Sequence, residues 1–298
     1  MTTPLPGFAA HRIVVGDNQI HARTAGSGPP LLLLHGYPQS LCMWHRVAPV
    51  LAGRFTVVLA DLRGYGRSSA PPPDPSGSTY SKRAMAADQV ALMTALGHER
   101  FGVIGHDRGG RVAHRLALDH RDRVAAIAVL DIVPTLHMFE SVDRAMATSY
   151  FHWFFLTQPD DLPERLINAD PETWVRSRFE RRHLGPFPFD PAALAEYLGA
   201  FRDPAVVAAT CADYRAAASV DLDHDRESRA QHQTVSSPLL ALWGSHSYVG
   251  RHFDVIDTWR NYATAVTGTA IEADHYLAEE APAPTAGQLE RFFLGLAW

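Results

Sequence analysis

The sequence contains little cysteine. Its 298 residues include two cysteines, Cys42 and Cys211, which lie far apart and form no C-x-x-C pair. Neither a disulfide framework nor a zinc ribbon can be built from them, and isolated cysteines suit a reducing compartment. The 16 histidines include no H-E-x-x-H motif, so no metal site is expected. We therefore predict a cytoplasmic protein that needs no metal and no other cofactor.

Long apolar runs and clusters of basic residues are also missing. The longest continuous apolar runs, Leu31–Leu34 and Val124–Leu130, are far too short to span a bilayer. The first residues show no charged segment followed by an apolar one, so no secretory signal is expected. The formal net charge is −5 and the basic residues form no stripe, which argues against nucleic acid as a partner. The sequence predicts neither membrane insertion nor nucleic acid binding.

Apolar residues are frequent enough for a sizeable core, with 46% hydrophobic and 20% charged residues. Two segments near the start, 11–15 and 18–23, are expected to pair as antiparallel strands. Strands and helices then alternate, which predicts an α/β fold with a mostly parallel sheet between layers of helices. The later strands are expected at 31–34, 55–60, 101–105, 124–130, 238–243 and 269–272, and the helices of this part at 43–51, 80–96, 108–120 and 282–296.

The alternation stops in the middle of the chain. From about residue 136 to 233 the strand-like runs disappear, and helical stretches follow one another with proline between them. We therefore expect an α/β core in two parts, 1–136 and 233–298, with a helical cap at 137–232. Such an insertion is well placed to cover the carboxyl ends of the strands, where ligands bind in open α/β folds.

The most informative segment is 101–110, FGVIGHDRGG, in which a buried strand runs into a tight turn and then a helix. This is the pattern of a nucleophile elbow, with Asp107 at the position where many hydrolases have serine. Gly105 and Gly109 would let the strand and the helix approach closely. The alternative is that Asp107 merely caps the helix that begins at Arg108, which is a common use of aspartate.

Three further motifs surround this elbow. The sequence HGYPQ at 35–39 follows one strand, DLRGYGRS at 61–68 follows the next, and His275 comes shortly after the last strand. With GHDRGGR at 105–111 and DYR at 213–215, these motifs resemble the fluoroacetate (haloacetate) dehalogenases of the α/β-hydrolase superfamily. The resemblance covers nearly the whole chain. It implies the α/β-hydrolase fold with an eight-stranded sheet and a helical cap, and a homodimer.

A carboxylate nucleophile selects the chemistry. Attack by Asp107 on a saturated carbon gives a stable alkyl ester, whereas attack on an acyl carbon would give an anhydride. His275 can activate a water that hydrolyses this ester, and the backbone N–H groups of Tyr37 and Arg108 can stabilise the oxyanion. Asp131, directly after a buried strand, is the expected partner of His275. It could instead be a simple turn residue before Pro134.

The substrate follows from the charges around the nucleophile. Arg108 and Arg111 lie on one face of the expected helix, and paired guanidiniums can hold the carboxylate of a haloacid against an anionic aspartate. The resemblance assigns both arginines to that carboxylate. It also assigns His152, Trp153 and Tyr214 to the departing halide, and their ring N–H and O–H groups are donors of the right kind. Without the resemblance, these three read equally well as core residues of a helical domain.

The sequence therefore predicts hydrolysis of short 2-haloacids, with fluoroacetate as the first candidate and water as the second reactant. Two alternatives stay open. An epoxide hydrolase would use the same Asp–His–Asp set, and a ligand receptor could keep the fold without catalysis. The chain departs from the family pattern at two points: Asp274 precedes the base, and the segment 179–187 has Arg181 and Arg182 but no tryptophan for a lid.

Overall fold

The computed structural model describes residues 4–180, 182–296 and 298. The strands are β1 (Ala9–Val15), β2 (Asn18–Ala25), β3 (Pro30–Leu34), β4 (Thr56–Ala60), β5 (Phe101–His106), β6 (Val124–Leu130), β7 (Leu239–Gly244) and β8 (Val266–Ile271). The helices outside the cap region are η1 (Leu41–Trp44), α1 (Ala48–Leu51), η2 (Ser78–Tyr80), α2 (Lys82–Ala95), α3 (Arg108–Asp119), η3 (Arg121–Arg123), α12 (Tyr248–His252), α13 (Val255–Arg260), α14 (Leu277–Glu280) and α15 (Pro282–Leu294).

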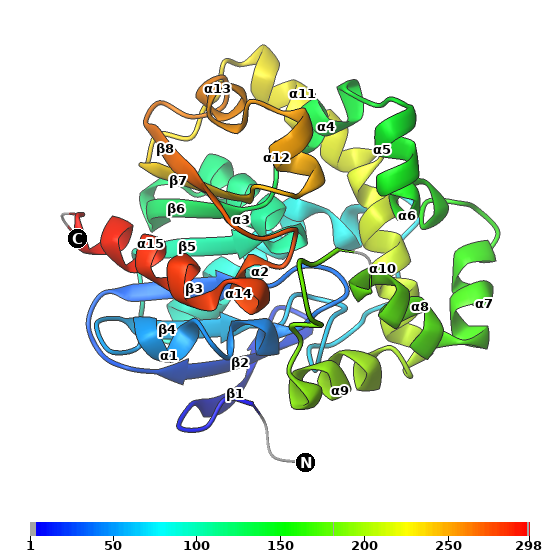
Figure 1. The fold of residues 1–298 in the computed structure, drawn as a ribbon, viewed down its shortest axis with the longest axis horizontal. Helices are drawn as coiled ribbons and strands as arrows, with labels where there is room; N and C mark the ends of the chain where they lie inside the picture. The colour runs from blue at the N-terminus through cyan, green and yellow to red at the C-terminus, as the bar shows by residue number, and fades with distance from the viewer. Residues whose placement is uncertain (1–3, 181, 297) are drawn as a thin grey trace.

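The strands form one 8-stranded sheet in the order β1-β2-β4-β3-β5-β6-β7-β8. β1 pairs antiparallel with β2 and β2 with β4, and every later pair is parallel. β5 and β6 are buried along their whole length, as expected for strands covered on both faces. In Figure 1, α1 and α15 lie in front of the sheet and α2 and α3 behind it. The predicted α/β fold with a mostly parallel sheet is confirmed.

Between β6 and β7, the regular elements of the described chain are helices. They are α4 (Thr135–Glu140), α5 (Arg144–Ser149), α6 (Phe151–Phe155), α7 (Leu162–Ala169), α8 (Pro171–Phe179), α9 (Pro191–Ala200), α10 (Pro204–Ala217) and α11 (Val220–Ala230). Figure 1 shows most of them gathered on one side of the sheet. Several of these helices begin with proline in their first turn, where its missing N–H is harmless.

Two sequence predictions of elements were wrong in detail. The single helix expected at 43–51 is two short helices, η1 and α1, because Pro49 lies in the first turn of α1 and cannot donate to the preceding turn. The last strand is Val266–Ile271 rather than 269–272. β8 is an edge strand with most side chains half-buried or exposed, so its apolar pattern is weak. No described helix has the length and apolar character of a membrane span.

Candidate active site

Asp107 lies in a strained turn between β5 and α3. Its backbone has φ 46° and ψ −112°, a conformation that costs free energy and persists when the surroundings enforce it. A Cβ at Gly105 would lie 2.4 Å from the Gly109 carbonyl oxygen, and a Cβ at Gly109 would lie 2.5 Å from the His35 oxygen. The Asp107 side chain makes no capping hydrogen bond to α3. The helix-cap alternative is therefore wrong, and the turn is an elbow that presents a carboxylate.

Asp107, His275 and Asp131 come together at the carboxyl ends of β5 and β6. The Nδ1–H of His275 donates to Asp131 Oδ2 at 2.6 Å, and its Nε2 lies 3.6 Å from Asp107 Oδ2. The other oxygen of Asp131 accepts from the backbone N–H of Gly244 at 3.1 Å. Asp131 is buried and has φ 52°. Because its carboxylate binds the ring and the end of β7, it is more than a turn residue.

The charges of these groups are set by burial and by one another. Burial alone would raise the pKa of Asp107, but the adjacent His275 ring and the nearby charge of Arg108 outweigh it and hold that pKa well below its usual range. Burial and Arg182 lower the pKa of His275, yet the adjacent carboxylate of Asp107 and the hydrogen bond to Asp131 raise it above its ordinary value. Asp107 is thus an anion that faces a basic imidazole.

A second histidine, His106, lies beside His275 but stays neutral. The rings of His106 and His275 have centroids 4.7 Å apart, and burial lowers the pKa of His106 to about 3. Its Nε2–H donates to the backbone oxygen of His275 at 2.9 Å. This bond fixes the tautomer of His106 and anchors the loop that carries the base.

The loop after β3 holds a peptide group next to Asp107. His35 accepts from the N–H of Leu62 at 3.0 Å through Nε2, so its Nδ1 carries the proton and donates to Gly36 O at 2.9 Å. Because the Gly36–Tyr37 peptide is planar and trans, the N–H of Tyr37 points away from that carbonyl. A Cβ at Gly36 would lie 2.7 Å from the Asp107 Cβ. The Tyr37 peptide is therefore within the immediate surroundings of Asp107.

Arg108 is buried and carries an ion pair that the sequence prediction did not include. Its Nε and Nη2 donate to the two carboxylate oxygens of Asp213 at 2.8 and 2.7 Å. Lys82 forms a second ion pair with Asp213. The third nitrogen, Nη1, is buried and finds no hydrogen-bond partner among the described residues. The guanidinium also stacks 4.2 Å from the ring of Tyr214. Arg108 thus keeps one donor free in a fixed orientation.

Arg111 is buried without a carboxylate partner among the described residues. Its Nη1 donates to the Val133 oxygen at 3.1 Å and to the Thr135 hydroxyl at 3.0 Å, and its Nε has no partner in that part of the chain. Burial lowers the pKa of Arg111 to about 10. A guanidinium in this state is stabilised by any anion that reaches it.

The three residues that the resemblance assigned to the halide are also brought together. His152 and Trp153 lie on α6 and Tyr214 on α10, and the ring centroids of His152 and Trp153 are 5.7 and 6.1 Å from that of Tyr214. The Nδ1 of His152, the indole N–H of Trp153 and the hydroxyl of Tyr214 are buried and have no partner within the described chain. Buried donors without partners are costly, so this cluster has the character of a site for an acceptor.

Sequence reasoning missed several residues of this region. Asp213 stood in a quoted motif without a role, and Lys82 had no signal at all because its partner is 131 positions away. Tyr150 and Arg178, which lie between β6 and β7, were not singled out either. Arg182, noted only for a missing tryptophan, stacks 4.5 Å from the ring of Tyr150. Arg181 lies outside the described residues.

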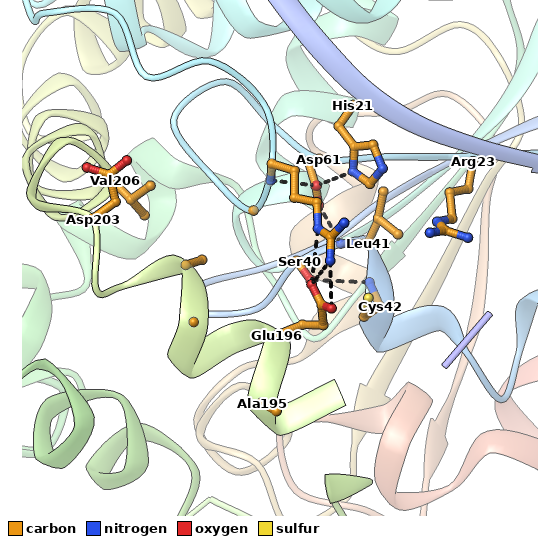
Figure 2. A pocket seen from close by; sticks show the side chains of 14 residues that line it. His21, Arg23, Ser40, Leu41, Cys42, Asp61, Ala195, Glu196, Asp203 and Val206 are labelled. Carbon is orange, nitrogen blue, oxygen red and sulfur yellow. Dashed lines mark hydrogen bonds and ion pairs between the residues drawn. The ribbon is translucent and has the colours of Figure 1, made fainter. Parts of the chain in front are cut away.

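A cavity of about 490 Å³ lies between α9 and the first part of the core (Figure 2). None of the predicted site residues lines it. Arg67 and Glu196 form an ion pair in its wall at 2.8 Å, and Asp61 binds His21 at 2.8 Å. The Arg67–Glu196 pair ties α9 to the core, and the Asp61–His21 bond lies within the core. Among the described residues, no group of three or more His, Cys, Asp or Glu side chains could hold a metal ion.

The fold and the elbow define a hydrolase of the α/β type. A family model described as alpha/beta hydrolase fold matches residues 29–282, and the chain belongs to this family, which confirms the predicted resemblance at that level. Within the family, the chain is 46% identical over 287 residues to the fluoroacetate dehalogenase of a Burkholderia sp, covering 96% of this chain and 94% of that protein.

Two other relatives place this likeness in context. The soluble epoxide hydrolase of Corynebacterium sp. (strain C12) is 35% identical over 292 residues, covering 96% of this chain and 97% of that protein. The crystal structure of ALR0039, an alpha/beta hydrolase from Nostoc sp PCC 7120, superposes with a TM-score of 0.95 at 51% identity. That likeness covers 97% of this chain and 98% of the other. The likeness to the dehalogenase therefore extends over nearly the full length at higher identity than the likeness to the epoxide hydrolase.

Proposed function

We propose that the protein hydrolyses short 2-haloacids to 2-hydroxyacids, with fluoroacetate as the first candidate substrate. The observation that carries the proposal is a carboxylate nucleophile between two kinds of unpartnered donor. On the core side are the free nitrogens of Arg108 and Arg111, and on the cap side are the ring N–H and O–H groups of the halide cluster. The first set suits a carboxylate and the second a departing halide.

In the first step, an oxygen of Asp107 attacks the carbon that bears the halogen. A carbon–oxygen bond forms, the carbon–halogen bond breaks, and its electron pair leaves with the halide. Arg108 and Arg111 hold the substrate carboxylate and offset its repulsion by Asp107. His152, Trp153 and Tyr214 donate to the halide as its charge develops, which matters most for fluoride because the carbon–fluorine bond is strong.

In the second step, His275 takes a proton from water and the hydroxide attacks the carbonyl carbon of the Asp107 ester. The N–H groups of Tyr37 and Arg108 stabilise the tetrahedral oxyanion. Asp131 stabilises the imidazolium and keeps the ring in the required tautomer. Collapse releases the hydroxyacid, regenerates the Asp107 carboxylate with one oxygen from water, and leaves a proton to be returned to solvent by His275.

The decisive experiment traps the ester. A His275→Asn variant treated with fluoroacetate should gain the mass of one carboxymethyl group on Asp107 and release one fluoride per site. Digestion and peptide mass spectrometry locate the adduct. An unchanged mass in this variant, beside a wild-type protein that defluorinates, would show that the reaction does not pass through a covalent ester.

Epoxide hydrolysis is the second candidate, since the same Asp–His–Asp set opens epoxides. It needs tyrosine hydroxyls to protonate the epoxide oxygen, and Tyr214 supplies one unpartnered hydroxyl. A guanidinium at Arg108 and a second at Arg111 favour an anionic substrate instead. Parallel assays with fluoroacetate, chloroacetate and styrene oxide separate the two functions, and no turnover of any of them would point to a non-catalytic receptor.

We also propose that residues 137–232 act as a cap, that the protein is a homodimer, and that it works in the cytoplasm. The apolar side chains of Leu162 and Leu166 on α7, 46% and 56% exposed, favour a subunit contact there. Both cysteines are buried free thiols, which suits a reducing compartment. Light scattering of wild type and of a Leu166→Glu variant tests the dimer, with a monomer expected for the variant.

A further inference from the structure

Three arginines line a cavity of about 540 Å³ between the cap and the last part of the core. Arg178 lies near the end of α8, Arg182 follows that helix, and Arg251 lies on α12. Glu180 and Asp274 are the carboxylates in the same wall. None of the catalytic residues proposed above lines the cavity, although Asp274 is the chain neighbour of His275. The cavity therefore borders the active site from outside.

Two of these arginines, Arg178 and Arg182, form no direct ion pair with a described carboxylate, although Asp274 lies near enough to raise the pKa of Arg182. Arg178 donates to the Ser177 hydroxyl at 3.3 and 3.1 Å and stacks 4.5 Å from the rings of Phe151 and Trp174. Arg182 stacks on Tyr150 and forms no ion pair with a described side chain. By contrast, two other buried arginines form ion pairs. Arg108 binds Asp213, and Arg115 binds Asp225.

Tyr150 connects Arg182 to the proposed halide residues. The guanidinium carbon lies 4.5 Å from the Tyr150 ring, and the centroid of this ring lies 5.7 Å from that of His152 and 5.9 Å from that of Trp153. The charge of Arg182 also acts on the proposed base. After burial, it is the next largest cause that lowers the pKa of His275. Arg182 is thus one aromatic ring away from the site.

Arg178 is coupled to the site through the core. Its backbone oxygen accepts from the hydroxyl of Tyr276 at 3.1 Å, and Tyr276 follows His275 in the chain. Trp174, one turn earlier on α8, donates to the hydroxyl of Tyr37. The segment that carries both arginines is therefore held against the residues that flank the nucleophile and the base.

We infer that this cavity is the entrance for anionic substrates and that Arg178 and Arg182 select carboxylates on their way to Arg108 and Arg111. The wall holds more arginines than carboxylates, and guanidiniums without a direct ion-pair partner raise the local concentration of anions. Neither side chain contacts the reacting atoms, so both act on binding and specificity. The inference rests on the proposed function for the identity of the substrate, but the attraction of a small carboxylate can be measured without turnover.

The test compares Arg182→Gln, Arg178→Gln and the double variant with wild type. Loss of one charge should raise KM for fluoroacetate about tenfold. This is at the low end of the effects that electrostatic focusing has on local substrate concentration and association rate. The value of kcat on the high-pH plateau should change little. Arg182→Lys should restore most of KM, because it keeps the charge. Arg176→Gln is the matched control, since Arg176 lies on the same helix and pairs with Glu172 at the surface.

Binding of glycolate, titrated by calorimetry, gives a readout that does not need catalysis. The Kd for glycolate should rise about tenfold in Arg182→Gln and stay unchanged in Arg176→Gln. If wild type binds glycolate but hydrolyses no haloacid, the proposed function fails, and the glycolate values alone decide this inference. A Kd and a KM that both stay within twofold of wild type in the double variant would overturn it.

A third readout separates charge from packing. Removing the charge of Arg182 should move the acid limb of the kcat profile to higher pH, because Arg182 lowers the pKa of His275. Arg182→Lys should keep the wild-type profile. The charged and titratable groups that face His275 from the elements around it are Asp107, Asp131, His106, His152, Arg182, Asp274 and Tyr276. Equal losses in the Lys and Gln variants with unshifted profiles would mean that Arg182 only packs the cap, and would refute the inference.

Discussion

Arg108 binds Asp213 through two of its three guanidinium nitrogens and leaves the third without a partner. Asp213 lies on α10 of the cap region and Arg108 directly after the nucleophile. The pair therefore fixes the direction of the free nitrogen and also joins α10 to α3. Lys82 on α2 completes the arrangement from a third element.

Replacing Asp213 should damage stability and activity together. Asp213→Asn leaves two buried cations facing a neutral amide, and breaking a buried ion pair costs about 3–5 kcal/mol. We expect a drop of that order in the free energy of unfolding and a lower kcat/KM for fluoroacetate. Denaturant titration and steady-state kinetics measure both. Asp223→Asn, at an exposed surface ion pair with Arg226, should change either quantity very little.

Asp131→Asn should slow the hydrolysis of the ester more than its formation. The ring of His275 loses the carboxylate that stabilises its charged form, and comparable changes lower kcat by about 10³–10⁴-fold. Rapid quenching followed by intact mass measurement should show the covalent adduct accumulating. The neighbouring variant Asp274→Asn should not accumulate it, because Asp274 makes no hydrogen bond to the ring of His275. An Asp131→Asn protein without adduct would contradict the assignment of Asp131 to the second step.

The base should titrate differently in the free enzyme and in the ester. In the free enzyme, the adjacent carboxylate of Asp107 and the hydrogen bond to Asp131 raise the pKa of His275 above 6.5, so the ring becomes neutral only above that pH. Esterification removes the charge of Asp107 and with it one of the raising contributions. The pH midpoint of ester hydrolysis should therefore lie below the midpoint that NMR gives for His275 in the free enzyme. Equal midpoints would mean that Asp107 does not influence the base.

Glu279 should make the protein less stable as the pH rises. Its carboxyl accepts from Tyr197 of α9 at 2.9 Å and from Gln39 at 2.6 Å, and burial raises its pKa from 4.5 to about 8. A folded-state pKa above the unfolded value favours the protonated form. The stabilisation is complete below about pH 4.5 and is lost as the pH rises through about 8.

The variant Glu279→Gln keeps the shape of the side chain without a titrating proton. Denaturation curves between pH 5 and 9 should show a loss of stability with rising pH in wild type that is reduced in the variant, by an amount on the order of a few kcal/mol. Glu172→Gln, at an exposed position on α8, serves as the control. Parallel pH dependence in wild type and Glu279→Gln would contradict a raised pKa at this residue.

The sequence determined the sheet and the three residues that meet at the carboxyl ends of its central strands. Buried strands 101–105 and 124–130 are continuous apolar runs, and parallel strands bring their carboxyl ends together, so Asp107 and Asp131 could be placed side by side from order alone. The glycine pattern around Asp107 determined the elbow, because only glycine fits where strand and helix backbones nearly touch. His275 followed from its position after the last strand.

Only the tertiary structure decided what surrounds these residues. Arg108 pairs with Asp213 of α10, and Lys82 of α2 pairs with the same carboxylate, while the partners of Glu279 come from α9 and from the loop after β3. Such contacts join residues 82 to 240 positions apart, and no local pattern encodes which of the short helices between β6 and β7 face each other. The stacking of Arg182 on Tyr150 has the same origin. Periodicity and turn chemistry act within a few residues, whereas packing of the cap on the core depends on the shape of both.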